Sequence, residues 1–272
     1  MYKDFYNFTE NPFNVTADPE FFFSSARHAQ AFSHLLYGIQ QRKGIIVITG
    51  EIGTGKTTLC RTLLNRLDKN TKTAFILNPS FSDLQLLKII VHDLGIPETH
   101  RNKYALVNSL NAFLLQEASL AHNVVLIVDE AQNLGIKQLE QIRLLSNLET
   151  DKEKLLQIIL VGQPELCEKL KLPSLRQLNQ RVIVRYHIMP LDRAELPAYI
   201  RHRLHIAKAP QNSKPRVQFS DKAIDAIYET SKGTPRMINI LCDRALLAGF
   251  IAETYTIDEH IVQKSIEEVV CV

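Results

Sequence analysis

Apolar residues recur in two alternating patterns along the first part of the chain. Short runs rich in β-branched residues have the length and composition of buried strands, and they span 44–49, 73–77, 123–128, 156–161 and 182–188. Longer segments with helical spacing separate these runs, at 57–67, 84–94, 105–121, 136–148 and 165–178. Because strands that are apolar on both faces must be covered on both sides, the alternation predicts a parallel sheet with helices on each face.

After Pro190 the strand-like runs stop and only helical spacing remains. Asp192 and Glu195 form a capping-box pattern, Ser220 is a potential helix cap, and Thr234 stands directly before a proline. The helices expected from these signals, together with a last one, cover 192–205, 220–231, 234–252 and 258–268. A polar loop is predicted at 210–215. We therefore expect a nucleotide-binding domain over 1–191 and a small helical domain over 192–272.

The sequence GEIGTGKTT lies between a predicted strand and a predicted helix and fits the phosphate-loop pattern GxxxxGK[ST]. Glycines let backbone N–H groups surround phosphates at a helix N-terminus, where the helix dipole favours anions. We expect Lys56 to reach the β- and γ-phosphates, the Thr57 hydroxyl to bind Mg²⁺, and Thr58 to contact the α-phosphate. The expected nucleotide-binding residues of this loop are Gly50, Glu51, Ile52, Gly53, Thr54, Gly55, Lys56, Thr57 and Thr58.

A second motif, VVLIVDEAQ, ends a predicted strand with two carboxylates. Ligands of open α/β sheets bind outside the carboxyl ends of the strands. Asp129 is therefore expected to hold Mg²⁺ through water, and Glu130 to polarise the water that attacks the γ-phosphate. Together with the phosphate loop, these residues predict ATP and Mg²⁺ as ligands and ATP hydrolysis as the reaction.

Composition sets limits on other functions. The hydrophobic share of 45% and the charged share of 22% are ordinary for a soluble globular protein, and a net charge of +3 does not argue for a nucleic-acid ligand. The apolar runs are much shorter than the roughly 20 residues of a membrane span, and no signal-peptide pattern begins the chain. The four cysteines are widely spaced, which predicts reduced thiols rather than a zinc site.

With these motifs located, the chain resembles the AAA+ ATPases of the general secretion pathway protein A (ExeA) type over nearly its whole length. The shared segments are NPF at 11–13, LLYGI at 35–39, GEIGTGKTT, DEAQNL at 129–134, RLLSNLET at 143–150, LVGQPEL at 160–166, QRV at 180–182 and GTPRMINILCDRAL at 233–246. The resemblance implies a P-loop AAA+ fold: a parallel five-stranded sheet with strand order 5-1-4-3-2 and a C-terminal helical lid.

The resemblance also implies roles for residues outside the two motifs. Gln163 would align the attacking water, and Arg236 would bridge the lid to the phosphates. Arg181 would be the arginine that acts on the nucleotide of a neighbouring subunit, with Arg176 and Arg185 as alternatives. Asn11, Pro12, Phe13 and Tyr37 would lie near the adenine, whereas residues 21–23 are expected in the core. The absence of a guanine signature after the fifth strand favours ATP over GTP.

The expected position of Arg181 follows from the strand order. We expect it at the start of the edge strand, on the far side of the Gln163 strand from Lys56 of the same chain. It would then act only between subunits, and ATP would favour a homo-oligomeric ring or filament.

The resemblance implies an ATP-driven oligomeric motor or switch that helps to assemble an envelope secretion, pilus or polysaccharide-export system. Such a protein would be cytoplasmic, without a membrane span of its own, and would reach the inner membrane through a protein partner. Longer family members continue into a membrane span and a cell-wall-binding region, so a cell-wall role is not carried over. The alternatives are a DNA-associated AAA+ switch, with a basic face at Arg176, Arg181, Arg185, Arg193, Arg201 and Arg203, and a nucleotide-gated binding module, which an intact Glu130 disfavours.

Overall fold

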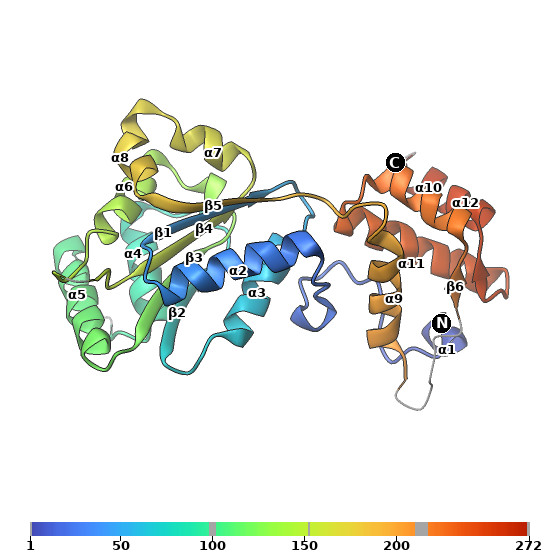
Figure 1. Cartoon of the computed structure of the whole chain (residues 1–272), viewed down its shortest axis with the longest axis horizontal. Helices are drawn as coiled ribbons and strands as arrows, with labels where there is room; N and C mark the ends of the chain where they lie inside the picture. The colour runs from blue at the N-terminus through green and yellow to red at the C-terminus, as the bar shows by residue number, and fades with distance from the viewer. Residues whose placement is uncertain (1, 98–101, 152, 210–216, 271–272) are drawn as a thin grey trace. The chain divides into compact units, whose positions relative to one another are not determined.

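The structure, a computed structural model, describes residues 2–97, 102–151, 153–209 and 217–270 (Figure 1). Contacts divide the chain into two units. One comprises Ala26–Ile52 and Leu59–Ile188. The other comprises Met1–Ser25, Gly53–Thr58 and Met189–Val272.

The larger unit contains a five-stranded parallel sheet with the order β2-β3-β4-β1-β5. This confirms the predicted fold class and strand order. The strands are β1 (Ile45–Gly50), β2 (Thr71–Ile76), β3 (Asn123–Val128), β4 (Gln157–Gly162) and β5 (Val182–Ile188). Every residue of β1 and β4 is buried, as expected of central strands covered on both faces. In the edge strand β5, exposed and partly buried residues alternate up to the buried Ile188.

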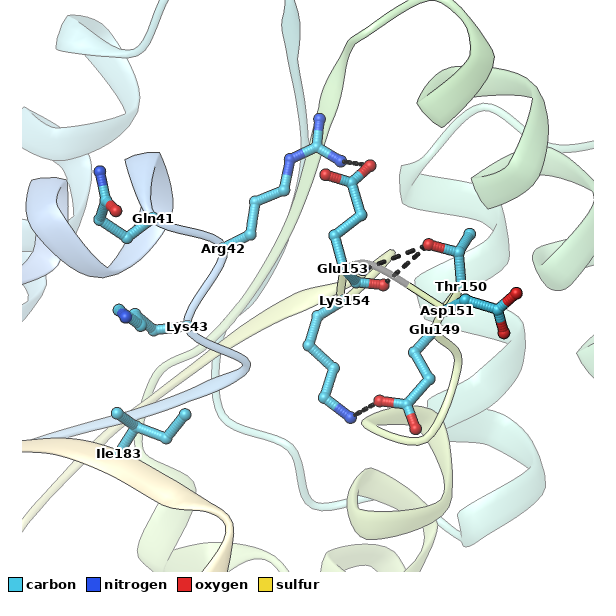
Figure 2. Close-up of a pocket in the computed structure, with 9 residues that line it drawn as sticks. All are labelled: Gln41, Arg42, Lys43, Glu149, Thr150, Asp151, Glu153, Lys154 and Ile183. Atoms are coloured by element: carbon cyan, nitrogen blue, oxygen red, sulfur yellow. Dashed lines mark hydrogen bonds and ion pairs between the residues drawn. The ribbon is translucent and has the colours of Figure 1, made fainter.

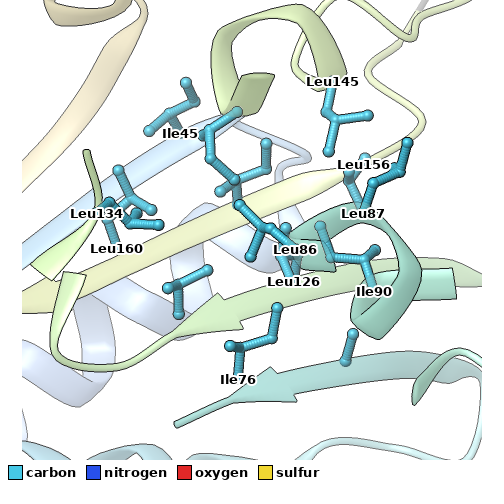
Figure 3. Close-up of a cluster of buried hydrophobic side chains, with 14 of the residues drawn as sticks. Ile45, Ile76, Leu86, Leu87, Ile90, Leu126, Leu134, Leu145, Leu156 and Leu160 are labelled. Carbon is cyan, nitrogen blue, oxygen red and sulfur yellow. The ribbon is translucent and has the colours of Figure 1, made fainter. Parts of the chain in front are cut away.

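Helices cover both faces of this sheet, and their bounds are α2 (Ala26–Gln40), α3 (Lys56–Arg66), α4 (Asp83–Asp93), α5 (Lys103–Ser119), α6 (Ile136–Leu145), α7 (Glu165–Leu170) and α8 (Arg176–Gln180). Ile45 and Val47 of β1 join the apolar cluster formed with α4, α5 and α6 (Figure 3). The alternate residue Ile46 points to the other face, since successive side chains of a strand alternate. There it packs so closely on α2 that a Cβ on Gly38 would lie 2.2 Å from the Ile46 Cδ1 atom.

Two features of this unit differ from the expectation. The single helix predicted over 165–178 is broken into α7, a 3-10 turn at Pro173–Leu175 and α8. Proline lacks the backbone N–H that a continuous helix would need at this position, which explains the break. Helix α2 was not predicted, although its buried residues Ala31, Leu35 and Ile39 have helical spacing.

The smaller unit is mainly helical and has its own apolar cluster. Its elements are α1 (Tyr2–Tyr6), a 3-10 turn at Pro19–Phe21, α9 (Leu196–Ala207), β6 (Gln218–Phe219), α10 (Asp221–Ser231), α11 (Pro235–Ile251), β7 (Thr256–Ile257) and α12 (Glu259–Val270). The expectation of helices alone was wrong, because β6 and β7 form a small parallel pair. The caps Ser220 and Thr234 stand where predicted. Helix α9 begins only at Leu196, although the Glu195 carboxylate does accept the Asp192 N–H at 3.0 Å. The predicted loop at 210–215 lies outside the described residues.

The N-terminal segment packs into this helical unit through a buried arginine. The Arg203 guanidinium donates to the backbone oxygens of Pro12 at 2.6 Å and Asn14 at 3.0 Å, and lies over the Phe21 ring. The Tyr6 hydroxyl donates to the backbone oxygens of Leu246 and Thr254. Residues at the two ends of the sequence therefore share one core. No helix within the described ranges is long and apolar enough to cross a membrane.

Candidate nucleotide-binding site

The phosphate loop connects the end of β1, at Gly50, to the start of α3, at Lys56. Gly53 and Gly55 have φ angles of 80° and 90°, in a region that side-chain-bearing residues rarely adopt. The Lys56 side chain is 5% exposed. Its position at the N-terminus of α3, where the helix dipole favours anions, suits a phosphate.

The first turn of α11 packs on this loop. The Arg236 N–H donates to the Gly53 oxygen at 3.2 Å, and a Cβ on Gly53 would lie 2.6 Å from the Arg236 Cβ atom. A larger residue than glycine at position 53 would therefore separate the loop from Arg236. The role of Arg236 in contacting phosphate stays a prediction.

The two predicted carboxylates lie directly after β3. Asp129 is buried, and its Oδ1 atom accepts the Glu130 N–H at 2.9 Å. Glu130 has φ 53° and ψ 37°, the left-handed conformation, which is unusual for a residue with a side chain and is found disproportionately at functional sites. Gly50 and Asp129 thus lie at the same carboxyl edge of the sheet, where β4 separates their strands.

Two glutamine side chains contact the Glu130 carboxylate. The Gln132 Nε2 atom donates to Glu130 Oε2 at 2.5 Å, and the Gln163 Nε2 atom donates to the same oxygen at 3.4 Å. The Gln132 Oε1 atom in turn accepts the Gln163 backbone N–H at 3.0 Å. The family resemblance gave a role to Gln163 but none to Gln132, because only the fold brings the end of β4 beside the turn after β3.

The turn that carries these residues is held by further contacts. Lys169 of α7 donates to the backbone oxygens of Gln132 and Leu134, at 2.5 and 2.9 Å. The Asn133 side chain donates to Asn78 after β2 at 3.1 Å. The turn is therefore held by α7 and by the segment after β2, independently of the glutamine side chains.

Arg181 directly precedes β5, so it lies at the amino ends of the parallel strands, opposite the carboxyl edge that holds Gly50 and Asp129. The expectation that it lies beyond the Gln163 strand was wrong, because β5 pairs directly with β1 and not with β4. The two strands are parallel, with Ile45 beside Val182 and Gly50 beside Ile188. At about 3.3 Å per residue, Val182 lies roughly 17 Å along the sheet from Gly50, and Arg181 is one residue further away. Arg181 is therefore too far away to act on a phosphate at Gly50 of its own chain. The reason is that the two neighbouring strands run in the same direction, which puts Arg181 and Gly50 at opposite ends.

A polar cavity of about 590 Å³ also lies at this amino edge, and Figure 2 shows the residues that line it. Ion pairs join Arg42 to Glu153 and Lys154 to Glu149 across it. Lys154 and, more weakly, Arg181 hold the pKa of Glu149 below its usual range. The cavity lining contains none of the predicted nucleotide-binding residues. Of the alternative arginines, Arg176 is exposed and Arg185 donates to the oxygens of Asn179.

The residues expected near adenine belong to different parts of the structure. Phe13 is 1% exposed and packs edge-on against Phe219, and Pro12 is buried beside Arg203. Asn11 is exposed, and Tyr37 is an exposed residue of α2. Their contact with adenine stays a prediction. Phe21 is buried in the apolar cluster of the smaller unit, as expected.

The donor groups fit a magnesium nucleotide. Mg²⁺ takes oxygen ligands and is commonly held by one or two carboxylates together with substrate phosphates. Asp129 offers a buried carboxylate at the carboxyl edge, and Thr57 offers a hydroxyl in the first turn of α3. A phosphate loop on a parallel sheet with these acidic residues defines a P-loop nucleotide-binding protein.

Comparison with known families narrows the class. Residues 39–170 match the family model described as AAA domain, so the chain carries an AAA domain. General secretion pathway protein A of Aeromonas hydrophila is 42% identical over 258 residues, which are 94% of this chain and 46% of that protein. The chain is thus an AAA-domain protein related to general secretion pathway protein A, which confirms the predicted resemblance. It spans about half the length of this relative.

Solved structures agree on the fold. The ORC2 protein of Aeropyrum pernix matches with a TM-score of 0.69 at 18% identity, over 96% of this chain and 72% of that one. A Drosophila ORC chain, in a structure of ORC bound to DNA, matches with a TM-score of 0.67 at 16% identity, over 99% of this chain and 65% of that one. At such identities the likeness shows the fold alone.

Proposed function

We propose that this chain binds ATP with Mg²⁺ and hydrolyses it to ADP and phosphate. The observation that carries the proposal is the conformation of the phosphate loop. Gly53 and Gly55 both have positive φ angles, directly between a buried strand and the N-terminus of α3. This geometry turns successive backbone N–H groups toward one anion.

Each group has a role in this reaction. The loop N–H groups and Lys56 would bind the phosphates, while Thr57 and, through water, Asp129 would hold the metal. Bound Mg²⁺ would neutralise charge on the β- and γ-phosphates. Glu130 would accept a proton from the attacking water, Gln163 would orient that water, and Arg236 would bind phosphate oxygens from the helical side.

Replacing Glu130 with glutamine tests this proposal. The amide keeps the shape of the side chain but cannot accept the proton, so ATP binding should persist while turnover is lost. Glu267→Gln, the same chemical change at an exposed position of α12, is the matched control. ATP hydrolysis at the wild-type rate by purified Glu130→Gln protein would refute the role of Glu130.

We propose further that subunits assemble into a ring or filament in which Arg181 meets the neighbour's nucleotide, and that residues 192–272 act as a helical lid. The relationship to general secretion pathway protein A supports a part in assembling an envelope secretion, pilus or polysaccharide-export system. A cytoplasmic location, with a protein partner at the inner membrane, follows from the same proposal.

The alternative function is that of a DNA-associated switch. Its support is the fold likeness to ORC, one example of which is a complex with DNA. Two of the six arginines expected on a basic face do not suit it. Arg203 is buried with protein partners, and Arg193 forms an ion pair with Asp225. DNA binding measured at two salt concentrations tests this alternative, because phosphate contacts make affinity fall steeply as salt rises. We expect no such salt-dependent binding.

A further inference from the structure

Gln132 lies between the turn after β3 and the end of β4, and its side-chain amide contacts both. The Gln163 backbone N–H can only donate, so the amide oxygen of Gln132 must face it. The amide NH₂ group is then directed to Glu130, where it donates to Oε2 at 2.5 Å. An amide is suited to this place because it offers an acceptor on one side and a donor on the other.

The Gln132 amide occupies space that is open only because residue 162 is a glycine without a side chain. Gly162 is the last residue of β4, and a Cβ there would lie 2.7 Å from Gln132 Oε1 and 3.2 Å from the Gln132 backbone nitrogen. Any side chain at position 162 would therefore displace the Gln132 amide. Gly162 does not have a positive φ angle, so this role comes from close approach and not from backbone conformation.

Gln132 and Gln163 contact the carboxylate unequally. The Gln163 donor is 3.4 Å from Glu130 Oε2, at the limit of a hydrogen bond, whereas the Gln132 donor is much closer. The shorter bond is the one that fixes the carboxylate. The Gln163 amide is then available to face a water molecule or phosphate, the role the proposed function gives it.

We propose that Gln132 is a positioning residue: its amide, oriented by the Gln163 backbone, sets the direction of the Glu130 carboxylate for attack by water on the γ-phosphate. The inference rests on the proposed function of Glu130. It adds a residue that acts through Glu130 and has no contact of its own with the nucleotide.

Three variants test it, and the turn should survive each one because Lys169 binds two of its backbone oxygens and the Asn133 side chain bonds to Asn78. Gln132→Ala removes both amide contacts. Gln132→Glu keeps an acceptor for the Gln163 N–H but sets a like charge against Glu130. Gly162→Ala pushes the amide away without changing any polar group. Gln116→Ala, at an exposed position of α5, is the matched control.

In each variant we expect kcat to fall by about 10- to 100-fold, the scale of a misplacement near 1 Å. The KM for ATP, the Kd of a fluorescent ATP analogue and the thermal unfolding midpoint should match those of the Gln116→Ala control. Gly162→Ala should have a smaller effect in the Gln132→Ala background than in the wild type, because both changes remove the same amide contact. A crystal structure of nucleotide-free Gln132→Ala should have the Glu130 carboxylate moved and the backbone of 129–134 unmoved.

Wild-type kcat in Gln132→Ala and Gln132→Glu, an unmoved Glu130 carboxylate, or additive losses in the double variant would overturn the inference. A parallel measurement on Glu130→Gln distinguishes failure of the proposed function from failure of the positioning role. If Glu130→Gln retains wild-type turnover, the proposed function has failed. If Glu130→Gln is inactive while the Gln132 variants are normal, only the positioning role has failed.

Discussion

Replacing Arg203 with methionine is expected to loosen the N-terminal segment from the helical unit. The arginine is 5% exposed and donates to the oxygens of Pro12, Asn14 and the Tyr199 hydroxyl, at 2.6, 3.0 and 3.0 Å. Methionine has a similar length and can fill the space, but it offers no hydrogen-bond donor. The change therefore separates the polar contacts of Arg203 from its packing.

The three contacts do not contribute equally. Asn14 is exposed, so water can replace its lost donor, and the Tyr199 hydroxyl keeps its bond to Asn239 at 2.8 Å. The buried Pro12 oxygen loses a hydrogen bond from a charged group, which costs about 1.5–3 kcal/mol. Loss of the contact with the Phe21 ring adds about 0.5–1 kcal/mol. The lost hydrogen bond and the lost ring contact should add approximately, so we expect the free energy of unfolding of this unit to fall by about 2–4 kcal/mol.

Urea unfolding followed by far-UV circular dichroism measures this loss, and mass spectrometry after brief proteolysis locates it. New cleavage within residues 7–18 is expected in Arg203→Met. Arg201→Met, an exposed residue two positions earlier on α9, is the control. If the two variants unfold at the same urea concentration and resist protease equally, the anchoring role of Arg203 is wrong.

Three further predictions concern the nucleotide, the assembly and pH. Lys56→Ala should abolish ATP binding in a calorimetric titration, whereas Lys72→Ala, an exposed change on β2, should bind normally; equal binding by both would contradict the phosphate role of Lys56. Arg181→Ala should bind ATP but lose turnover, and mixing it with Lys56→Ala should restore activity; a wild-type rate per subunit that does not depend on protein concentration would count against action between subunits. Burial lowers the pKa of His202, whose ring Nε2 atom is buried without a hydrogen-bond partner. The unfolded chain therefore binds a proton first as pH falls below about 6.5, and stability is lost there. His202→Phe should lose less thermal stability than wild type between pH 7.5 and 5.5, and parallel losses would refute this.

Much of the larger unit could be predicted from the sequence because its central strands β1, β3 and β4 are buried on both faces. A strand that must be apolar on both faces leaves a continuous run, and the strand at 123–128 was located to the residue. The phosphate loop and the Asp129–Glu130 pair were recognisable because their chemistry depends on residues adjacent in sequence. The two-residue strands β6 and β7 are too short to produce a periodic pattern of apolar residues, and the residues that they pair lie far apart in the chain.

Contacts between distant segments account for most of the remaining differences between the expectations from sequence and the structure. Arg203 belonged to an expected basic face, yet the N-terminal segment buries it, and no local pattern reports that packing. Gln132 gains its role only where β4 ends beside it, at Gly162. The expected position of Arg181 failed for a simpler reason: the predicted strand order, which the structure confirms, already places β1 between β4 and β5, so β5 could not lie beyond the Gln163 strand.

A crystal structure with Mg²⁺ and a non-hydrolysable ATP analogue would show where this chain binds the nucleotide. We expect the triphosphate against the backbone N–H groups of Gly53–Thr58, with Lys56 at the β- and γ-phosphates. The metal ion should be bound by Thr57 and linked through water to Asp129, and the Glu130 carboxylate should face a water molecule in line with the γ-phosphate. A nucleotide bound elsewhere, or an empty phosphate loop at saturating nucleotide concentration, would refute ATP binding by this loop.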